Sequence, residues 1–151
     1  AVKKAEALVE DACARGAKVV CGGRRWRTNH AWFEPTILTS VDRSMRIANE
    51  EAFAPIAPVF RFRNDKEVLE MANDTAAGLM AYIYTSDVSR MWSFGERLEV
   101  GMVAINEGVI ATELAPFGGV KESGMGREGS KYGIDEYVEI KQICFGGLRT
   151  L

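Results

Sequence analysis

Two short apolar runs separated by one helical segment constrain the fold of this chain most strongly. They occupy residues 79–84 (LMAYIY) and 100–105 (VGMVAI), with helical spacing over 89–98 between them. Uninterrupted apolar runs of this length are typical of strands that are covered on both faces. Parallel strands need a crossover, usually a helix, and the middle segment supplies it. The sequence therefore predicts an α/β fold with a parallel sheet, right-handed crossovers and flanking helices.

The N-terminal part of the chain extends this alternation of helices and strands. An amphipathic helix is predicted over 2–14, because apolar residues recur there at helical spacing. A second helix is predicted over 65–72, with Asn64 or Asp65 as its N-cap. Three extended segments are predicted between these helices, at 17–21, 32–38 and 56–62.

Composition limits the classes of partner. The net charge of −2 argues against nucleic acid, whose phosphates favour a basic face. No apolar run approaches the roughly 18 residues of a membrane-spanning helix, so we expect no membrane partner. Cys13, Cys21 and Cys144 are odd in number and, with the single His30, lack metal-ligand spacing. We therefore expect reduced thiols, no metal site and a cytoplasmic location.

A glycine-rich segment matches the spacing of a dinucleotide-binding loop. Gly124, Gly126 and Gly129 follow the pattern G-x-G-x-x-G. Such a loop needs a strand directly before it and an acidic residue about twenty positions after it. The nearest predicted strand ends at Ile105, and the chain ends in CFGGLRTL, which has no acidic residue. We interpret the glycines as a structural turn between a long loop and a short helix that ends near Tyr137.

Residues 138–145 predict a late strand with one solvated face. Apolar and polar side chains alternate along this segment. A strand left at the end of a chain exposes unpaired backbone groups and apolar side chains. We therefore expect it to pair with elements outside residues 1–137, in another subunit or in protein that this chain does not include.

Several motifs, in order, resemble the C-terminal part of the aldehyde dehydrogenase superfamily. They are EALVEDACARGAKVVCGG, Glu34-Pro35-Thr36, NEEAFAP at 49–55, and PFGGVKESGMGREGSKYGIDEYVEIKQ. INEGVIATELAPFGG and REGSKYGIDEYVEIKQICFGGL are similar to the succinate-semialdehyde dehydrogenase branch in particular. The chain also begins within a helical pattern and without methionine, so we expect it to be part of a longer protein.

The resemblance implies a division of the chain into three parts. Residues 1–106 would form part of the α/β catalytic domain, and 107–137 a long anchor loop and helix. Residues 138–151 would form an oligomerisation strand and tail, through which the family assembles into homodimers or homotetramers. A different reading stays open, in which the segment is a non-catalytic assembly module.

The resemblance also implies the chemistry. Family members oxidise aldehydes with NAD or NADP, using a cysteine nucleophile, a glutamate base and an asparagine oxyanion donor that lie upstream of the matched segment. We therefore expect no catalytic residue in this chain, and no activity from the chain alone. The implied substrate is a small semialdehyde, with succinate semialdehyde as the first candidate.

Two residues of NEEAFAP are implied to bind the cofactor. By the match, Glu51 holds the hydroxyls of the nicotinamide ribose and Phe53 packs beside the nicotinamide. A carboxylate suits two vicinal hydroxyls, and an aromatic face suits a flat ring. The competing readings are a surface or capping acid for Glu51 and a core ring for Phe53. Ala54 departs from the family pattern, which has glycine, and alanine would be strained there if the position needs a positive φ.

Three residues of the long loop are implied to contact the substrate. Phe117 would line the aldehyde tunnel, or else anchor the loop as a buried ring. The branch has a serine that helps to bind the substrate carboxylate, and the match places it at Ala111, which has no hydroxyl. Thr112 is the adjacent residue that could replace it. We interpret the charged runs at 24–27 and 121–122 as solvated loop faces.

Overall fold

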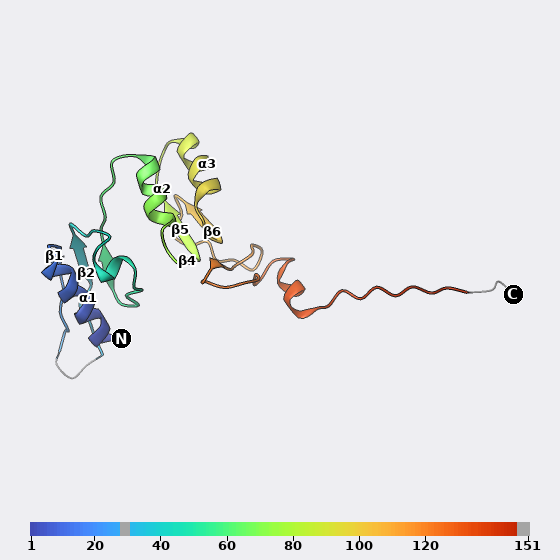
Figure 1. The fold of residues 1–151 in the computed structure, drawn as a ribbon, viewed down its shortest axis with the longest axis horizontal. Coiled ribbons are helices and arrows are strands. Elements are labelled where there is room, and N and C mark those ends of the chain that lie inside the picture. Colours follow the sequence, from blue (N-terminus) through green and yellow to red (C-terminus); the bar gives the residue numbers. More distant parts are fainter. Residues whose placement is uncertain (28–30, 148–151) are drawn as a thin grey trace. The chain divides into compact units, whose positions relative to one another are not determined.

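The computed structural model describes residues 1–27 and 31–147 (Figure 1). His30 and the end of the predicted tail, from residue 148 onward, lie outside the described residues. The chain divides into two compact units, Ala1–Val68 and Leu69–Leu151.

The first unit packs a helix on a three-stranded sheet. Helix α1 (Val2–Ala14) matches the predicted helix and buries its apolar face, Ala5, Leu8, Val9 and Ala12. The sheet has the order β1-β2-β3, with β1 at Lys18–Cys21, β2 at Thr36–Thr39 and β3 at Ile56–Pro58. The central strand β2 runs antiparallel to β1 and parallel to β3.

The prediction of a purely parallel sheet is wrong for this unit. The described residues between β1 and β2 contain no helix, and an isolated Arg25–Phe33 bridge lies in this connection; the two strands run antiparallel. The short 3₁₀ helix η1 (Arg46–Ala48) lies in the connection that lets β3 return parallel to β2. All three strands are shorter than predicted, because only the paired residues lie in the ladder.

The hydrophobic core of this unit lies between α1, β2 and the η1 region. Leu8 and Leu38 are fully buried, and Met45 and Ile47 fill the space beside η1. By contrast, every residue of β1 is exposed, including Val19 and Val20. The core is therefore built on one side of the central strand.

Thr36 places a buried hydroxyl where β2 meets its neighbours. Its side chain is 2% exposed; the hydroxyl donates to the Glu34 carbonyl at 2.7 Å and accepts from the Gly23 amide at 2.8 Å. A Cβ on Gly22, which has a φ of +69°, would lie 2.2 Å from the Pro35 carbonyl oxygen and 2.7 Å from this hydroxyl. The chain therefore needs glycine and threonine together at this point.

The second unit contains the predicted strand–helix–strand element. Strand β5 (Met80–Ile83) and strand β6 (Met102–Ile105) pair in parallel, with helix α3 (Val88–Arg97) between them in the chain. The parallel pairing is confirmed, although the sheet has only two strands. The side chains of Leu79 and Tyr82 are 41% and 52% exposed, so the expected cover on both faces is wrong within this chain.

Side-chain caps define the ends of these helices and strands. Asp87 caps α3 by accepting from the Arg90 amide at 3.0 Å. Helix α2 (Asp65–Asn73) begins as predicted, with Asn64 accepting from the Glu67 amide at 3.0 Å. The Asn106 side chain bonds both backbone groups of Thr85, at 2.9 and 2.8 Å, and so extends the β5–β6 ladder by one step.

A two-residue strand pair, not predicted from the sequence, holds the glycine-rich region. Strand β4 (Ala77–Gly78) pairs antiparallel with β7 (Val120–Lys121). The Lys121 ammonium donates to the carbonyls of Asn73 and Thr75 and pairs with Glu99 at 2.7 Å. Lys121 and Glu122 are both exposed residues, as the interpretation of a solvated face requires, but the Lys121 side chain is only 25% exposed and also anchors the loop.

After β7 and a short helix, the last described residues form an extended segment. The predicted short helix is the 3₁₀ helix η2 (Gly133–Tyr137). Residues 138–147 run extended after it, at the red end of the ribbon in Figure 1, without a ladder to other described residues. The predicted strand at 138–145 therefore pairs with none of the described residues, and its apolar side chains, such as Ile140 and Phe145, are exposed.

Replacing Thr36 by valine removes the buried hydroxyl at similar volume and leaves the Gly23 amide and the Glu34 carbonyl without this partner. We expect Thr36→Val to lower the free energy of unfolding by about 1–3 kcal/mol in urea titrations. Thr39→Val is the matched control, because the Thr39 hydroxyl makes a longer, exposed bond of 3.4 Å to Lys18. Equal losses for the two variants would contradict the role given to Thr36.

Candidate functional site

The segment between η1 and β3 presents Glu51 and Phe53 on the surface. Glu51 is exposed and has no polar partner among the described residues, and Phe53 is 83% exposed. Ala52 and Ala54, which alternate with them, are partly buried and pack against the core of the first unit. The two predicted cofactor residues, which are two positions apart in the chain, are therefore an acid and a ring that are both accessible. Phe53 is not a core ring and Glu51 caps none of the described helices, whereas the alternative of a surface acid fits the exposure of Glu51.

The backbone strain in this segment lies at Phe53, not at Ala54. Phe53 has a φ of +37°, whereas Ala54 is not among the residues with a positive φ. The alanine that departs from the family pattern is therefore accommodated without the strain considered from the sequence. A bulky residue in the left-handed region costs roughly 1–2 kcal/mol, and the packing on either side of Phe53 must offset it.

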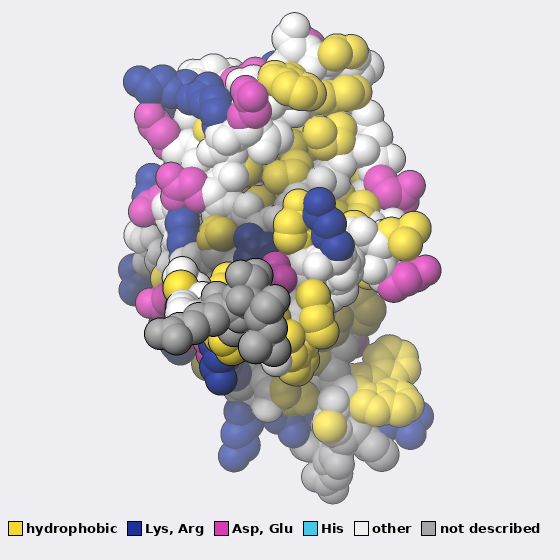
Figure 2. All heavy atoms as spheres, turned by 90° about the vertical axis from the view of Figure 1, so that its right-hand side faces the viewer, with side chains coloured by type: hydrophobic (Ala, Val, Ile, Leu, Met, Phe, Trp, Pro, Cys, Tyr) yellow, Lys and Arg dark blue, Asp and Glu magenta, His cyan; other side chains and the backbone are white. Residues whose placement is uncertain are grey.

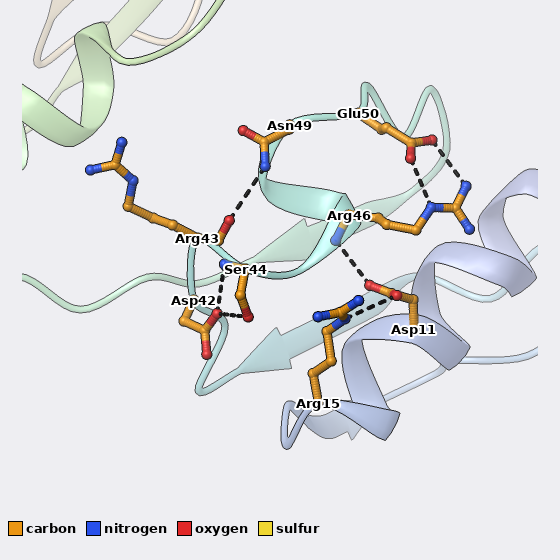
Figure 3. A network of polar contacts seen from close by, with 8 residues as sticks. All are labelled: Asp11, Arg15, Asp42, Arg43, Ser44, Arg46, Asn49 and Glu50. Carbon is orange, nitrogen blue, oxygen red and sulfur yellow. Dashed lines mark hydrogen bonds and ion pairs between the residues drawn. The ribbon is translucent and has the colours of Figure 1, made fainter.

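A polar network holds the η1 region just before this segment (Figure 3). The Asp11 carboxylate, on α1, accepts from the Arg46 amide at 2.9 Å and from the Arg15 guanidinium at 3.1 Å. The Arg46 guanidinium donates twice to Glu50, at 2.7 and 3.1 Å. The sequence suggests the Arg46–Glu50 pair by its spacing of four residues, but gives no sign that Asp11 joins it.

These contacts shift the pKa values of the groups involved. The hydrogen bond from the Arg46 amide is the main reason that the pKa of Asp11 lies below its usual value. The hydrogen bond from Arg46 lowers the pKa of Glu50 in the same way, and the Glu50 partner raises the pKa of Arg46. The Ser44 hydroxyl and amide lower the pKa of Asp42. All three carboxyl groups are therefore held in their charged form.

A second set of contacts shapes the long loop of the second unit. Phe117 and Glu128 exchange both backbone hydrogen bonds, at 2.9 and 2.7 Å, and the Ser130 amide bonds the Glu113 carbonyl at 2.8 Å. The Arg127 guanidinium donates to the carbonyls of Gly119 and Gly126 at 2.9 and 2.7 Å. The loop is thus closed on itself and not a disordered connection.

An open cavity of about 710 Å³ lies against this loop. Phe117 forms part of its wall, together with Gly118, Arg127, Glu128, Ile134 and Tyr137. Ala111 and Thr112 lie outside this lining and are exposed, and the Thr112 hydroxyl accepts from the Leu114 amide at 3.4 Å. Among the predicted substrate residues, only Phe117 therefore lies at the cavity.

The glycine pattern forms a turn and not a nucleotide cradle. Gly124, Gly126 and Gly129 all have positive φ values, and the element that follows is the five-residue η2. A Cβ on Gly126 would lie 2.5–2.7 Å from the carboxylate of Glu136 on η2, so an acidic group lies against the turn, and its charge disfavours a phosphate there. The short strand β7 precedes the turn more closely than Ile105, which was the predicted end of the preceding strand.

The three cysteines have no catalytic surroundings in the described part of the chain. Cys13, Cys21 and Cys144 are all free and exposed, and the Cys21 sulfur lies 3.8 Å from the Pro35 carbonyl oxygen. Within residues 1–27 and 31–147, no group of three or more His, Cys, Asp or Glu side chains could hold a metal ion. None of the described helices is both long and apolar enough to cross a bilayer.

Comparison with known proteins identifies the class to which this chain belongs. The aldehyde dehydrogenase family matches residues 1–143, which is most of the chain. The chain is therefore a member of the aldehyde dehydrogenase family, as its motifs predict.

Individual relatives are similar over nearly the whole chain. A succinate-semialdehyde dehydrogenase of Escherichia coli whose name includes NADP(+) is 51% identical over 146 residues, which is 97% of this chain and 30% of the relative. A 3-sulfolactaldehyde dehydrogenase of Pseudomonas putida is also 51% identical, over 98% of this chain and 30% of the relative. A crystal structure of succinate-semialdehyde dehydrogenase from Burkholderia pseudomallei is 55% identical, with a TM-score of 0.90 over 93% of this chain and 29% of that one. The chain thus spans less than a third of the length of these relatives.

The lowered pKa of Asp11 predicts an acid-dependent loss of stability in the first unit. Its carboxylate contributes stability above its unfolded pKa, near 3.8, and loses it as the pH falls through the lower folded value. We expect Asp11→Asn, which does not titrate, to lower the free energy of unfolding at neutral pH and to flatten its decline below about pH 4. Urea titrations from pH 2.5 to 7 measure this, and parallel profiles for the two proteins would contradict it.

Proposed function

We propose that this chain is the C-terminal part of an NAD- or NADP-dependent aldehyde dehydrogenase that oxidises a small semialdehyde, such as succinate semialdehyde, to the carboxylic acid. The observation that carries the proposal is the pairing of an accessible carboxylate and an accessible ring in NEEAFAP, in a chain of this family. The bound cofactor would accept the hydride, and the nucleophile and base would come from protein outside this chain.

Glu51 and Phe53 are the residues that we assign to the cofactor. A carboxylate with no internal partner is free to accept the two ribose hydroxyls, and an exposed ring can pack against the nicotinamide. Both side chains leave a segment whose alternate residues, Ala52 and Ala54, pack on the core, so their direction is set by the fold. These features fit a dinucleotide bound at this edge of the first unit.

Phe117 is the residue that we assign to the aldehyde, as one wall of the substrate tunnel. The paired backbone of Phe117 and Glu128 gives the ring a fixed base. We assign Ala111 and Thr112 to the region near the far end of the substrate. The named substrates of the two curated relatives carry a carboxylate in one case and a sulfonate in the other. An acid-bearing aldehyde is therefore the proposed class of substrate. Ala111 has no hydroxyl to bind the acid group, so the assay below compares two members of that class.

We assign the three parts of the chain as follows. Residues 1–106 belong to the catalytic domain, 107–137 form the anchor loop and helix, and 138–151 supply the oligomerisation strand and tail. The cytoplasmic location expected from the cysteines remains a prediction.

A chimera tests the proposed function. The matching segment of the Escherichia coli relative is replaced by this chain, and reduction of NAD and NADP is followed with succinate semialdehyde, 3-sulfolactaldehyde and uncharged butanal. We expect activity with the acid-bearing aldehydes, and none from the 151-residue chain alone. The control is the same chimera without the host's nucleophilic cysteine. A soluble, assembled chimera that oxidises none of the aldehydes would overturn the proposal, as would activity of the isolated chain that depends on one of its cysteines.

Glu51→Gln in the active chimera tests the cofactor assignment. The amide loses one acceptor and the charge, which is worth about 1.5–3 kcal/mol for charged hydrogen bonds. We expect a loss of roughly tenfold or more in kcat/KM for the cofactor, with little change in the unfolding temperature. Glu96→Gln, at an exposed glutamate on α3, is the matched control and should leave the kinetics unchanged. Unchanged cofactor kinetics in Glu51→Gln would remove Glu51 from the site.

The extended segment carries the assembly prediction. Residues 138–145 have unpaired backbone groups and exposed apolar side chains, including Ile140 at 101% and Phe145 at 79%. We propose that they add a strand to another subunit's sheet and support a homodimer or homotetramer. We expect Ile140→Asp to shift the chimera toward smaller species in sedimentation velocity, whereas Glu139→Gln should not. Identical sedimentation for all three proteins would contradict this role.

A further inference from the structure

We propose that the network of Asp11, Arg46 and Glu50 is a positioning device for the cofactor segment, so that helix α1 helps to aim Glu51 and Phe53. This inference rests on the proposed function of those two residues. It assigns a role to three residues that touch neither cofactor nor substrate in that proposal.

The far end of the segment is fixed by the central strand. The Thr36 amide of β2 donates to the Pro55 carbonyl at 2.8 Å, and strand β3 begins at the next residue. Ala54 packs on the core just before this point. The position of Phe53 therefore depends on how firmly the other end, at Glu50, is held.

The near end is fixed through α1. The Asp11 side chain is only 16% exposed, and one of its oxygens accepts from the amide that starts η1, that of Arg46, at 2.9 Å. The Arg46 carbonyl in turn accepts from the amides of Asn49 and Glu50, at 3.0 and 2.8 Å. A single carboxylate on the helix thus sets the start of a turn that ends at Glu50 (Figure 3).

The Arg46 side chain bonds to one of the two neighbouring glutamates and not to the other. It holds Glu50 by two bonds, at 2.7 and 3.1 Å, and leaves Glu51 without a partner among the described residues. A planar guanidinium suits such a two-point contact, whereas a lysine would hold the carboxylate at one point. The Arg46 guanidinium is therefore bound to Glu50, and the carboxylate oxygens of Glu51 remain available to accept hydrogen bonds from a ligand.

The small free energy of an exposed ion pair favours a positioning role for Arg46 over a role in stabilising the fold. The Arg46 and Glu50 side chains are 45% and 39% exposed, and ion pairs of this exposure add little to the stability of a fold. Such a pair can still narrow the range of conformations of a short segment held at both ends. The effect of losing it should therefore be seen in the cofactor kinetics and in local exchange rather than in the unfolding temperature.

Hydrogen–deuterium exchange on the 151-residue chain tests the device without any cofactor. We expect Arg46→Met to speed amide exchange over residues 49–54 by about two- to fivefold, and Asp11→Ala by about tenfold. Arg24→Met is the matched control, because it removes another exposed arginine of the same unit that pairs with a glutamate, Glu34. Unchanged exchange over 49–54 in both network variants, or an equal change in the control, overturns the inference.

A double-mutant cycle in the active chimera tests the link to the cofactor. We expect Arg46→Met to raise the KM for the cofactor by about two- to fivefold with kcat nearly unchanged, and Arg46→Lys to restore part of the loss. If the arginine acts through Glu51, the double variant Arg46→Met/Glu51→Gln should lose little beyond Glu51→Gln alone. Additive losses overturn the positioning role. If Glu51→Gln itself has no effect, the proposed function fails, while the exchange result still decides whether the network orders the segment.

Discussion

Strand β2 is the element on which the first unit depends. Its backbone hydrogen bonds hold β1, β3 and the end of the segment that precedes β3. It pairs with β1 on one side and β3 on the other, and it carries Leu38 into the core. At its first residue, the Thr36 amide bonds Pro55, and the Thr36 hydroxyl bonds Gly23 and Glu34. A residue that makes these three hydrogen bonds while only 2% exposed leaves its surroundings little freedom. The segment that presents Glu51 and Phe53 is therefore held firmly at Pro55, where it meets β2.

The chain leaves much apolar surface uncovered, and this follows from the sizes of its sheets. A sheet of two strands, such as β5–β6, cannot bury both of its faces, so that Tyr82 and, on α3, Trp92 remain 52% and 71% exposed. Figure 2 shows hydrophobic side chains interspersed with charged ones on the visible surface. Exposed apolar area on this scale is typical of surfaces that contact other protein. This exposed apolar area agrees with the length of the chain, which is less than a third of that of its relatives. The two-stranded sheet also explains why apolar runs that predict buried strands are half-exposed here.

Local patterns predicted the elements that depend on local physics. The helical spacing of 2–14, the cap at Asn64 and the strand–helix–strand spacing of 79–105 all gave elements close to those observed. The sequence could not reveal β4 and β7, because two-residue strands exist only through pairing across about forty residues of chain. Nor could it place Lys121, whose partners Asn73 and Thr75 are distant in the chain and are backbone carbonyls. The alternation at 138–145 is present, but a ladder needs a partner that the described residues do not contain.

The candidate site shows the same division between local and distant causes. The adjacent acids of NEEAFAP can be seen in the sequence, and so can the spacing of four residues between Arg46 and Glu50. The Arg46 guanidinium holds Glu50 and not Glu51, and Asp11, which lies 35 residues before Arg46, fixes the amide where the turn starts. In our proposal these two neighbouring carboxylates therefore have different tasks: Glu50 is held in the network, and Glu51 is left to the cofactor. The strain at Phe53 is compatible with this arrangement, because a residue held at a φ of +37° persists only where the chain on both sides is fixed. Phe53 and Glu51 therefore project into solvent from a segment that α1 holds at one end and β2 holds at the other.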